Sequence, residues 1–250
     1  GENKTGLLHL DADGKELKRI EFSQTDEDGN SFYVSNFFVD NSGNVYLSDW
    51  QNVYIYDQDG NKKTTVDLSE NGGELCELKA GVVGVCYYKN DEAKPEESGR
   101  VFQEIDPATG KLTGDTVKIP DSAYNFFPGD DVYDIYYDYN GNIYGYKFDT
   151  DTKDKVIDWI ECDINSNNLN SYSILPDGRV IAFENTYDDQ TQTNTMQLIV
   201  MTRVDAASVV NKTVLTFACM YLDWDMRDAI VKFNRASNTH RIVVREYSED

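Results

Sequence analysis

The sequence predicts a mainly β protein: a β-propeller-like array of about five four-stranded blades, incomplete or irregular, followed by a short C-terminal βαβ segment. Three observations predict this fold class: a recurring turn, the interval at which it returns, and a change of pattern at Lys212. The turn is built on Asp-x-x-Gly-Asn/Lys between short aromatic and β-branched runs. Because Asp hydrogen bonds the turn backbone and Gly adopts positive φ without steric cost, each copy predicts a β-hairpin. With small variations, the turn occurs at Asp11–Lys15, Asp40–Asn44, Asp57–Asn61, Asp106–Lys111, Asp138–Asn142 and Pro176–Arg179.

The turns alternate between two kinds. One kind joins two apolar or aromatic runs, such as Phe37–Val39 and Val45–Leu47. The other leads from a run ending in Asp into a polar strand rich in Lys and Thr, such as Lys62–Leu68. This alternation fits a propeller blade, because neighbouring blades cover both faces of the inner strands while solvent surrounds the outermost strand.

The second kind of turn returns at Gly14, Gly60 and Gly110, at intervals of about 45 to 50 residues. A repeat of this length with four strands is typical of β-propellers. A β-sandwich with Greek-key connections is the alternative fold, and the long interval disfavours it.

The predicted blades follow one another along the chain and form one propeller-like domain over residues 1–210. The last of them has inner strands at Tyr172–Leu175, Val180–Glu184 and Met196–Val204, with a polar loop between the second and third. The blade segments are residues 1–22 (two outer strands only), 31–68, 73–119, 131–170 (with a weak outer strand) and 171–204 (inner strands only).

A different pattern begins at Lys212. Thr213–Met220 is a continuous apolar run that predicts a strand, and Arg241–Tyr247 predicts a second strand. Between them, apolar residues spaced by three and four positions predict one face of a helix, and Asp223 or Asp225 can cap its first turn. Strand, helix and strand predict a βαβ unit with parallel strands, which we expect as a second, incomplete domain over residues 211–250. Its apolar face, Met226, Ile230 and Phe233, should pack on the propeller or on another copy of the chain.

Residues 212–250 resemble the beginning of an extracellular solute-binding protein of the ABC-transporter type. The residues that carry the resemblance are Leu215–Ala218 in the first strand, the pair Phe233-Asn234 near the end of the helix, and Arg241–Val244 in the second strand. The preceding repeats resemble the propeller modules that stand before such a domain in some bacterial surface lipoproteins.

This resemblance implies a non-catalytic binding or scaffold module on the cell surface, serving uptake or sensing of a nutrient, with carbohydrate as the favoured solute. It implies an ABC permease as partner, through parts of the family's binding domain that lie outside residues 1–250. Because the sequence starts at Gly1 and shows no lipobox cysteine, we expect the lipid anchor to precede it.

The composition limits the partners. Lys and Arg number 23 against 45 Asp and Glu, which gives a net charge of −22. Such a chain repels nucleic acid and anionic lipid, and it has no basic stripe for phosphate contacts. No apolar stretch is long enough for a membrane helix.

Four aromatic residues are candidate ligand-binding positions: Trp50, Tyr136, Trp159 and Trp224. An aromatic face packs well on the apolar face of a pyranose ring, and Trp50 stands at the end of a predicted strand, where propeller loops form binding surfaces. The other interpretation is that these side chains fill the space between blades.

Cys76 and Cys86 form a candidate pair. If the turn lies at Ala80–Val82, the two cysteines face each other across a hairpin, at a distance that allows a disulfide. The alternative is a pair of buried thiols that pack as small apolar side chains.

No motif predicts an enzyme, a cofactor or a metal. The run Asp149–Asp154 lacks the glycine and the final glutamate of a calcium loop, and a solvated acidic loop is the preferred interpretation of Asp130, Asp131 and Asp134. We therefore expect a non-catalytic protein. Two alternatives stay open: an interaction propeller that binds no small molecule, and a propeller enzyme acting on polysaccharide.

Overall fold

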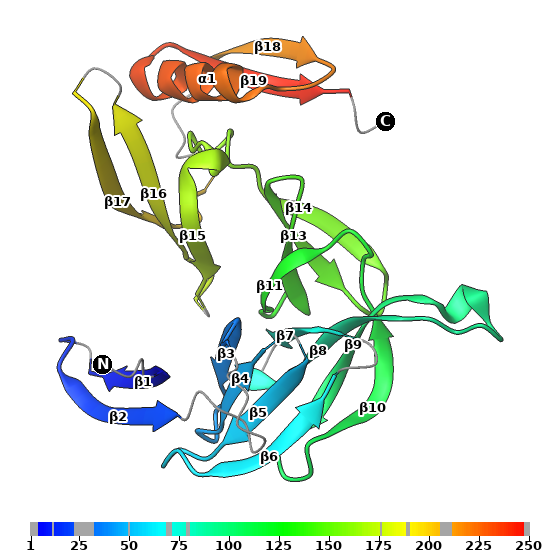
Figure 1. The fold of residues 1–250 in the computed structure, drawn as a ribbon. Coiled ribbons are helices and arrows are strands. Elements are labelled where there is room, and N and C mark those ends of the chain that lie inside the picture. The colour runs from blue at the N-terminus through cyan, green and yellow to red at the C-terminus, as the bar shows by residue number, and fades with distance from the viewer. Residues whose placement is uncertain are drawn as a thin grey trace. The chain divides into compact units, whose positions relative to one another are not determined.

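The computed structural model describes residues 5–11, 13–22, 33–49, 51–68, 72–78, 81–175, 177–188, 191–205 and 212–247. The chain divides into two compact units, Gly1–Ser122 and Ala123–Asp250, which are described separately (Figure 1). Strands dominate both units, and the described residues include one α-helix, so the mainly β prediction is confirmed. This division falls within the predicted propeller-like region, and the predicted boundary at residues 210 and 211 stays a prediction.

The first unit contains a two-stranded hairpin and two four-stranded antiparallel sheets. In both larger sheets the strands neighbour one another in chain order, which is the meander of a propeller blade. The hairpin is β1 (Thr5–Leu10) and β2 (Glu16–Phe22); one sheet is β3 (Asn36–Val39), β4 (Val45–Ser48), β5 (Asn52–Tyr56) and β6 (Lys62–Asp67); the other is β7 (Glu74–Glu77), β8 (Val83–Lys89), β9 (Gly99–Asp106) and β10 (Lys111–Lys118).

The inner strands β4 and β5 are buried on both faces, as the alternation of the turns predicts. On one face, Val53 and Ile55 join a core with Leu75 and Val85 of the sheet β7–β10. On the other, Leu47 and its neighbours pack against the hairpin β1–β2. Two layers therefore sandwich the sheet β3–β6, and this burial is the physical reason for its continuous apolar runs.

The second unit contains one four-stranded and one three-stranded antiparallel sheet, again with the strands in chain order. A shared core joins them, with Trp159, Ile143 and Val180 among its buried residues. With the two larger sheets of the first unit this makes four propeller-like sheets, where about five blades were expected. Strands β1 and β2, expected as the outer strands of a first blade, form a separate two-stranded sheet. The four-stranded sheet is β11 (Tyr124–Pro128), β12 (Ile135–Tyr139), β13 (Asn142–Lys147) and β14 (Thr152–Ile157); the other is β15 (Leu169–Ile174), β16 (Val180–Asp188) and β17 (Thr193–Met201).

The predicted βαβ unit is present in the second unit. Strands β18 (Thr213–Cys219) and β19 (His240–Glu246) are parallel, and the helix α1 (Trp224–Ala236) joins them. The carboxylate of Asp223 accepts a hydrogen bond from the Met226 amide at 2.8 Å, so Asp223 is the N-cap.

The packing of this βαβ unit partly matches the expected apolar face. Ile230 is buried with Leu222 and with Ile160, which follows the sheet β11–β14, so the unit packs on a propeller-like sheet. Met226 and Phe233 are each 39% exposed, because the buried side of α1 is turned toward Val231 and Asn234. The Asn234 amide donates to the Ile242 carbonyl at 2.9 Å and accepts from the Ile242 amide at 2.7 Å, which ties the helix to β19.

The expected cysteine register is wrong by two residues. Cys86 lies opposite Glu74, and Cys76 lies opposite Gly84, so the two cysteines are diagonal neighbours on one face of β7 and β8. The Leu78 amide donates to the Val82 carbonyl at 2.7 Å, in keeping with this shifted register. Both cysteines are buried and free, which agrees with the alternative of two packed thiols.

Candidate ligand-binding site

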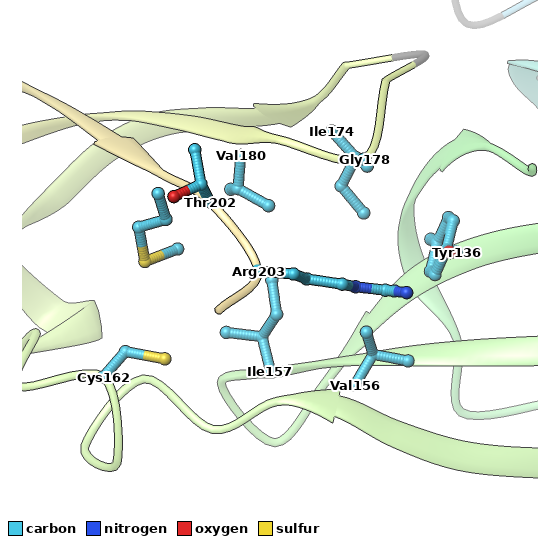
Figure 2. Close-up of a pocket in the computed structure, with 10 residues that line it drawn as sticks. Tyr136, Val156, Ile157, Cys162, Ile174, Gly178, Val180, Thr202 and Arg203 are labelled. Carbon is cyan, nitrogen blue, oxygen red and sulfur yellow. The ribbon is translucent and has the colours of Figure 1, made fainter. Parts of the chain in front are cut away.

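A pocket of about 180 Å³ lies in the second unit, between the sheets β11–β14 and β15–β17 (Figure 2). Apolar side chains from both sheets form most of its wall, while Tyr136 and Arg203 supply polar groups. We call it the Arg203 pocket. Its lining residues are Tyr136, Val156, Ile157, Cys162, Ile174, Gly178, Val180, Met201, Thr202 and Arg203.

Local structure explains how these residues converge. Tyr136 comes from the buried strand β12, while Val156 and Ile157 stand at the end of β14. The hairpin between β15 and β16 turns at Gly178, whose amide donates to the Leu175 carbonyl at 2.9 Å and whose φ of +79° favours glycine. Gly178 therefore brings the turn backbone to the edge of the pocket.

Arg203 follows the end of β17 and crosses the pocket. Figure 2 shows its side chain running between the two sheets, with the guanidinium ending beside Tyr136. The positive charge of Arg203 also acts on the carboxylate of Asp130, which lies next to Tyr136. The pocket thus has an apolar wall and a cation held near one end.

Asp130 and Tyr136 form a charged hydrogen-bonded pair at that end. The Tyr136 hydroxyl donates to Asp130 at 2.6 Å, and the amides of Val132 and Tyr133 donate to the same carboxylate at 2.7 and 3.1 Å. Burial alone would raise the pKa of Asp130, but these hydrogen bonds together with Arg203 hold that pKa below its usual value. Burial and the adjacent carboxylate raise the pKa of Tyr136, so at neutral pH the pair is a carboxylate and a neutral phenol.

A second hollow of about 370 Å³ adjoins the Arg203 pocket, since Gly178, Thr202 and Arg203 line both. Its other lining residues are charged: Asp130, Asp131, Asp177 and Arg179. The Arg179 guanidinium lies 2.7 Å from the Asp177 carboxylate, and this contact lowers the pKa of Asp177. We call Asp130, Asp131 and Asp177 the acidic rim. The combined site offers an apolar wall, one guanidinium and several carboxylate acceptors to a small molecule.

The lining contains one thiol, and its surroundings lower its reactivity. Cys162 is the one thiol in the lining, and partial burial, followed by the charges of Asp158 and Glu161, raises its pKa. A thiol with a raised pKa is largely protonated at neutral pH and is a weak nucleophile. In the described ranges no group of three or more His, Cys, Asp or Glu side chains is arranged to hold a metal ion.

The three predicted aromatic positions that the structure describes do not line one pocket together. Tyr136 lines the Arg203 pocket, although it is 2% exposed. Trp159 is 1% exposed and packs edge-on against Tyr172 at 5.2 Å between ring centroids, so its indole offers no face to a ligand, and the core interpretation holds there. Trp224 is 57% exposed at the start of α1 and does not line the pocket, and Trp50 lies outside the described residues.

The predicted acidic loops have structural roles. Asp154 accepts a hydrogen bond from the Tyr133 hydroxyl at 3.0 Å, and Asp151 accepts one from the Tyr146 hydroxyl. Asp134 accepts from the Phe148 amide at 2.8 Å.

Sequence reasoning missed Arg203, the central residue of the pocket. The predicted strand ran to Val204, which placed Arg203 inside a strand, whereas β17 ends at Met201. One signal was available: Arg203 is the first charged residue after an uncharged strand of nine residues. That signal marks a strand end, but the pocket itself arises from tertiary packing.

Comparisons with known proteins add little to this description. No protein-family model matches the chain, and no curated protein matches it. A solved structure titled as the crystal structure of the eukaryotic initiation factor is similar with a TM-score of 0.34 and 12% sequence identity. The similarity covers 80% of this chain and 49% of that chain, so this chain spans about half the length of that protein. Similarity at this level carries no argument about function, and the chain is characterised by its own propeller-like sheets, its βαβ unit and its Arg203 pocket.

Proposed function

We propose that this chain is a non-catalytic binding module of an extracellular solute-binding protein of the ABC-transporter type. The observation that carries the proposal is the parallel βαβ unit that packs on a propeller-like sheet. Both of its strands have an unpaired edge among the described residues, as expected of the first unit of a larger parallel sheet. The sequence resemblance over residues 212–250 falls on this same unit.

The packing of the βαβ unit supports a fixed junction. Arg235 on α1 contacts the buried carboxylate of Glu184 at 3.1 Å and the Asp163 carbonyl at 2.6 Å. Arg241 on β19 contacts the Asp163 carboxylate at 3.0 Å. Together with the apolar contacts of Ile230, these contacts hold the βαβ unit on the sheets of the second unit. The same sheets line the Arg203 pocket, so in this proposal ligand binding there changes the packing of the βαβ unit.

The solute that we propose for the Arg203 pocket is a carbohydrate. A sugar ring presents an apolar face to residues such as Ile174 and Val180, and its hydroxyls donate to the acidic rim and accept from Arg203. In this proposal the protein is displayed outside the cell on a lipid anchor and delivers nutrient to an ABC permease. The structure has no helix in its described ranges long and apolar enough to cross a membrane.

The proposal is tested by probing the whole chain with a glycan array and then measuring affinity for each retained sugar by calorimetry. Arg203→Met should weaken binding about tenfold or more, which corresponds to about 1.4 kcal/mol. Arg19→Met is the matched control, because Arg19 forms an exposed ion pair with Glu16 on the hairpin β1–β2. If no glycan is retained, or if both variants weaken binding equally, the carbohydrate site is wrong.

A second candidate function is an interaction module that binds no small molecule. The exposed apolar face of β16 and β17, described below, favours it. A chain that retains no glycan and no other small solute, and yet self-associates through that face, would support this candidate over the first.

A further inference from the structure

The outer strand β17 differs from the outer strands of the other propeller-like sheets. Three sheets contain four strands, but the sheet β15–β17 contains three, and β17 stands at its end (Figure 1). Among the described residues of the second unit, β17 has no hydrogen-bonded neighbour on the side opposite β16. Strand β17 therefore corresponds to the third strand of a blade, and this sheet has no fourth strand among the described residues.

The other outer strands are protected against further pairing. Each of β6, β10 and β14 contains at least two Lys residues, and each has an irregularity in its register with the neighbouring strand. Charges and bulges are the usual devices that prevent a sheet edge from pairing with another chain. Strand β17, with the sequence TNTMQLIVM, contains no charged residue and no proline, and it pairs with β16 over nine positions without irregularity. It has the properties of a strand that is covered on both sides.

One face of the same two strands is apolar and exposed. Phe183 lies opposite Leu198 and Ile181 lies opposite Val200, so these side chains share a face. The other face of β17 is turned toward the core, where Ile199 and Met201 pack. The exposed apolar residues of the first face are Phe183 (41%), Tyr187 (58%), Met196 (65%), Leu198 (58%) and Val200 (51%).

The charge pattern of the sheet β15–β17 indicates which kind of partner can pair with its free edge. The whole chain has a net charge of −22, yet the three strands of this sheet contain only Glu184 and Asp188 as charged residues. Glu184 is buried and paired with Arg235. A basic partner would therefore have almost no acidic side chain to pair with at this edge. A second copy of the same neutral, apolar edge can pair with it without repulsion between like charges at the strand.

We propose that two copies of this chain pair β17 with β17 in antiparallel fashion about a two-fold axis, forming a continuous six-stranded sheet. With Leu198 at the axis, Leu198 of each copy faces the same residue of the other, and Met196 faces the second copy's Val200. A strand paired with itself in antiparallel fashion satisfies two-fold symmetry, the commonest symmetry of oligomers. This inference does not depend on the proposed carbohydrate site.

The mass of the intact chain in solution tests the dimer, by light scattering after size exclusion and by sedimentation over a dilution series. The wild type should have twice the monomer mass of 28.5 kDa and should dissociate on dilution. Leu198→Lys should be monomeric, since it places two lysines opposite each other. Val214→Lys on β18 is the matched control, because Val214 is also 58% exposed, and it should stay dimeric.

A charge-swap pair separates loss of pairing from loss of folding. Leu198→Lys and Leu198→Glu should each be monomeric alone, and an equimolar mixture should recover a dimer because opposite charges then meet at the axis. A monomeric wild type at every accessible concentration overturns the proposal. A mixture that stays monomeric, or a Val214→Lys variant that dissociates as readily as Leu198→Lys, also overturns it.

Discussion

Asp40 shows how one side chain fixes a turn that the chain uses repeatedly. Its carboxylate accepts hydrogen bonds from the amides of Ser42 and Asn44 at 2.9 and 2.8 Å, and from the Tyr46 hydroxyl at 3.1 Å. The turn closes because the Gly43 amide donates to the Asp40 carbonyl at 2.9 Å, with φ of +80° at Gly43. Asp57 makes the equivalent amide contacts in its own turn, so the shared sequence motif corresponds to a shared structure.

Removing this carboxylate should destabilise the protein in proportion to the donors that it leaves unpaired. Asp40→Ala should lower the free energy of unfolding by about 1–2 kcal/mol, since a net hydrogen bond contributes about 1 kcal/mol and several are lost together. Asp115→Ala, at an exposed position of β10, is the control and should have little effect. Urea unfolding followed by tryptophan fluorescence measures both, and equal losses would contradict the role of the turn.

The same carboxylates predict how stability depends on pH. Burial alone would raise the pKa of Asp40, but its hydrogen bonds lower that pKa overall, and hydrogen bonds likewise lower the pKa of Asp130. Each contributes stability that is complete above the unfolded-state pKa of about 3.9 and is lost as the pH falls through the folded-state value. Stability should therefore fall as the pH drops below about 4, and Asp40→Asn should show a smaller fall. An identical pH profile for wild type and variant would contradict this.

At the scale of elements, local sequence patterns predicted which strands exist better than they predicted where each strand begins and ends. The turns, the doubly buried inner strands and the parallel βαβ unit follow from short stretches of sequence and are confirmed. Strand β16 extends to Asp188 and β17 begins at Thr193, although the polar stretch from Asn185 to Thr195 suggested a loop. Its alternating Thr, Asn and Tyr residues suit a strand whose one face is exposed, and composition alone does not distinguish that from a loop.

The predicted register of Cys76 and Cys86 was wrong for a related reason, because the register of a hairpin depends on where its turn is centred. In the diagonal arrangement we expect Cys76 and Cys86 to stay reduced. Burial, together with contact with Cys86, raises the pKa of the Cys76 thiol well above its usual value, which suppresses the reactive thiolate. A thiol assay on protein purified without reductant and then denatured should titrate all 4 cysteines. Two thiols missing, with a Cys76–Cys86 linked peptide in mass spectrometry, would contradict the prediction.

The helix α1 should depend on Asn234 more than on its exposed residues. Asn234 is fully buried and bonds both backbone groups of Ile242, so Asn234→Ala leaves a donor and an acceptor unpaired. We expect a loss of about 2–3 kcal/mol in local stability, seen as faster hydrogen exchange across β19. Lys232→Ala, which removes a surface ion pair with Asp228, should leave that exchange nearly unchanged. Equal exchange in both variants would show that Asn234 does not anchor the helix.

At the scale of the molecule, the attachment of the βαβ unit to the propeller-like sheets is the feature on which the proposed function depends most. Its central contact is between Arg235, whose side chain is 41% exposed, and Glu184, which is 1% exposed and also accepts from Gln197. Arg235→Met should leave that buried carboxylate with one neutral donor and should destabilise the second unit by about 1–3 kcal/mol, less than for a fully buried pair because solvent reaches the arginine.

The double variant Arg235→Met, Glu184→Gln distinguishes an unpaired charge from lost packing. If the cost of Arg235→Met comes from the stranded carboxylate, the neutral glutamine should recover most of the lost stability, although the arginine is still missing. Thermal unfolding of the wild type, both single variants and the double variant gives the coupling free energy directly. Additive losses would mean that the ion pair does not hold the βαβ unit, and the junction would then rest on Ile230 and its apolar neighbours alone.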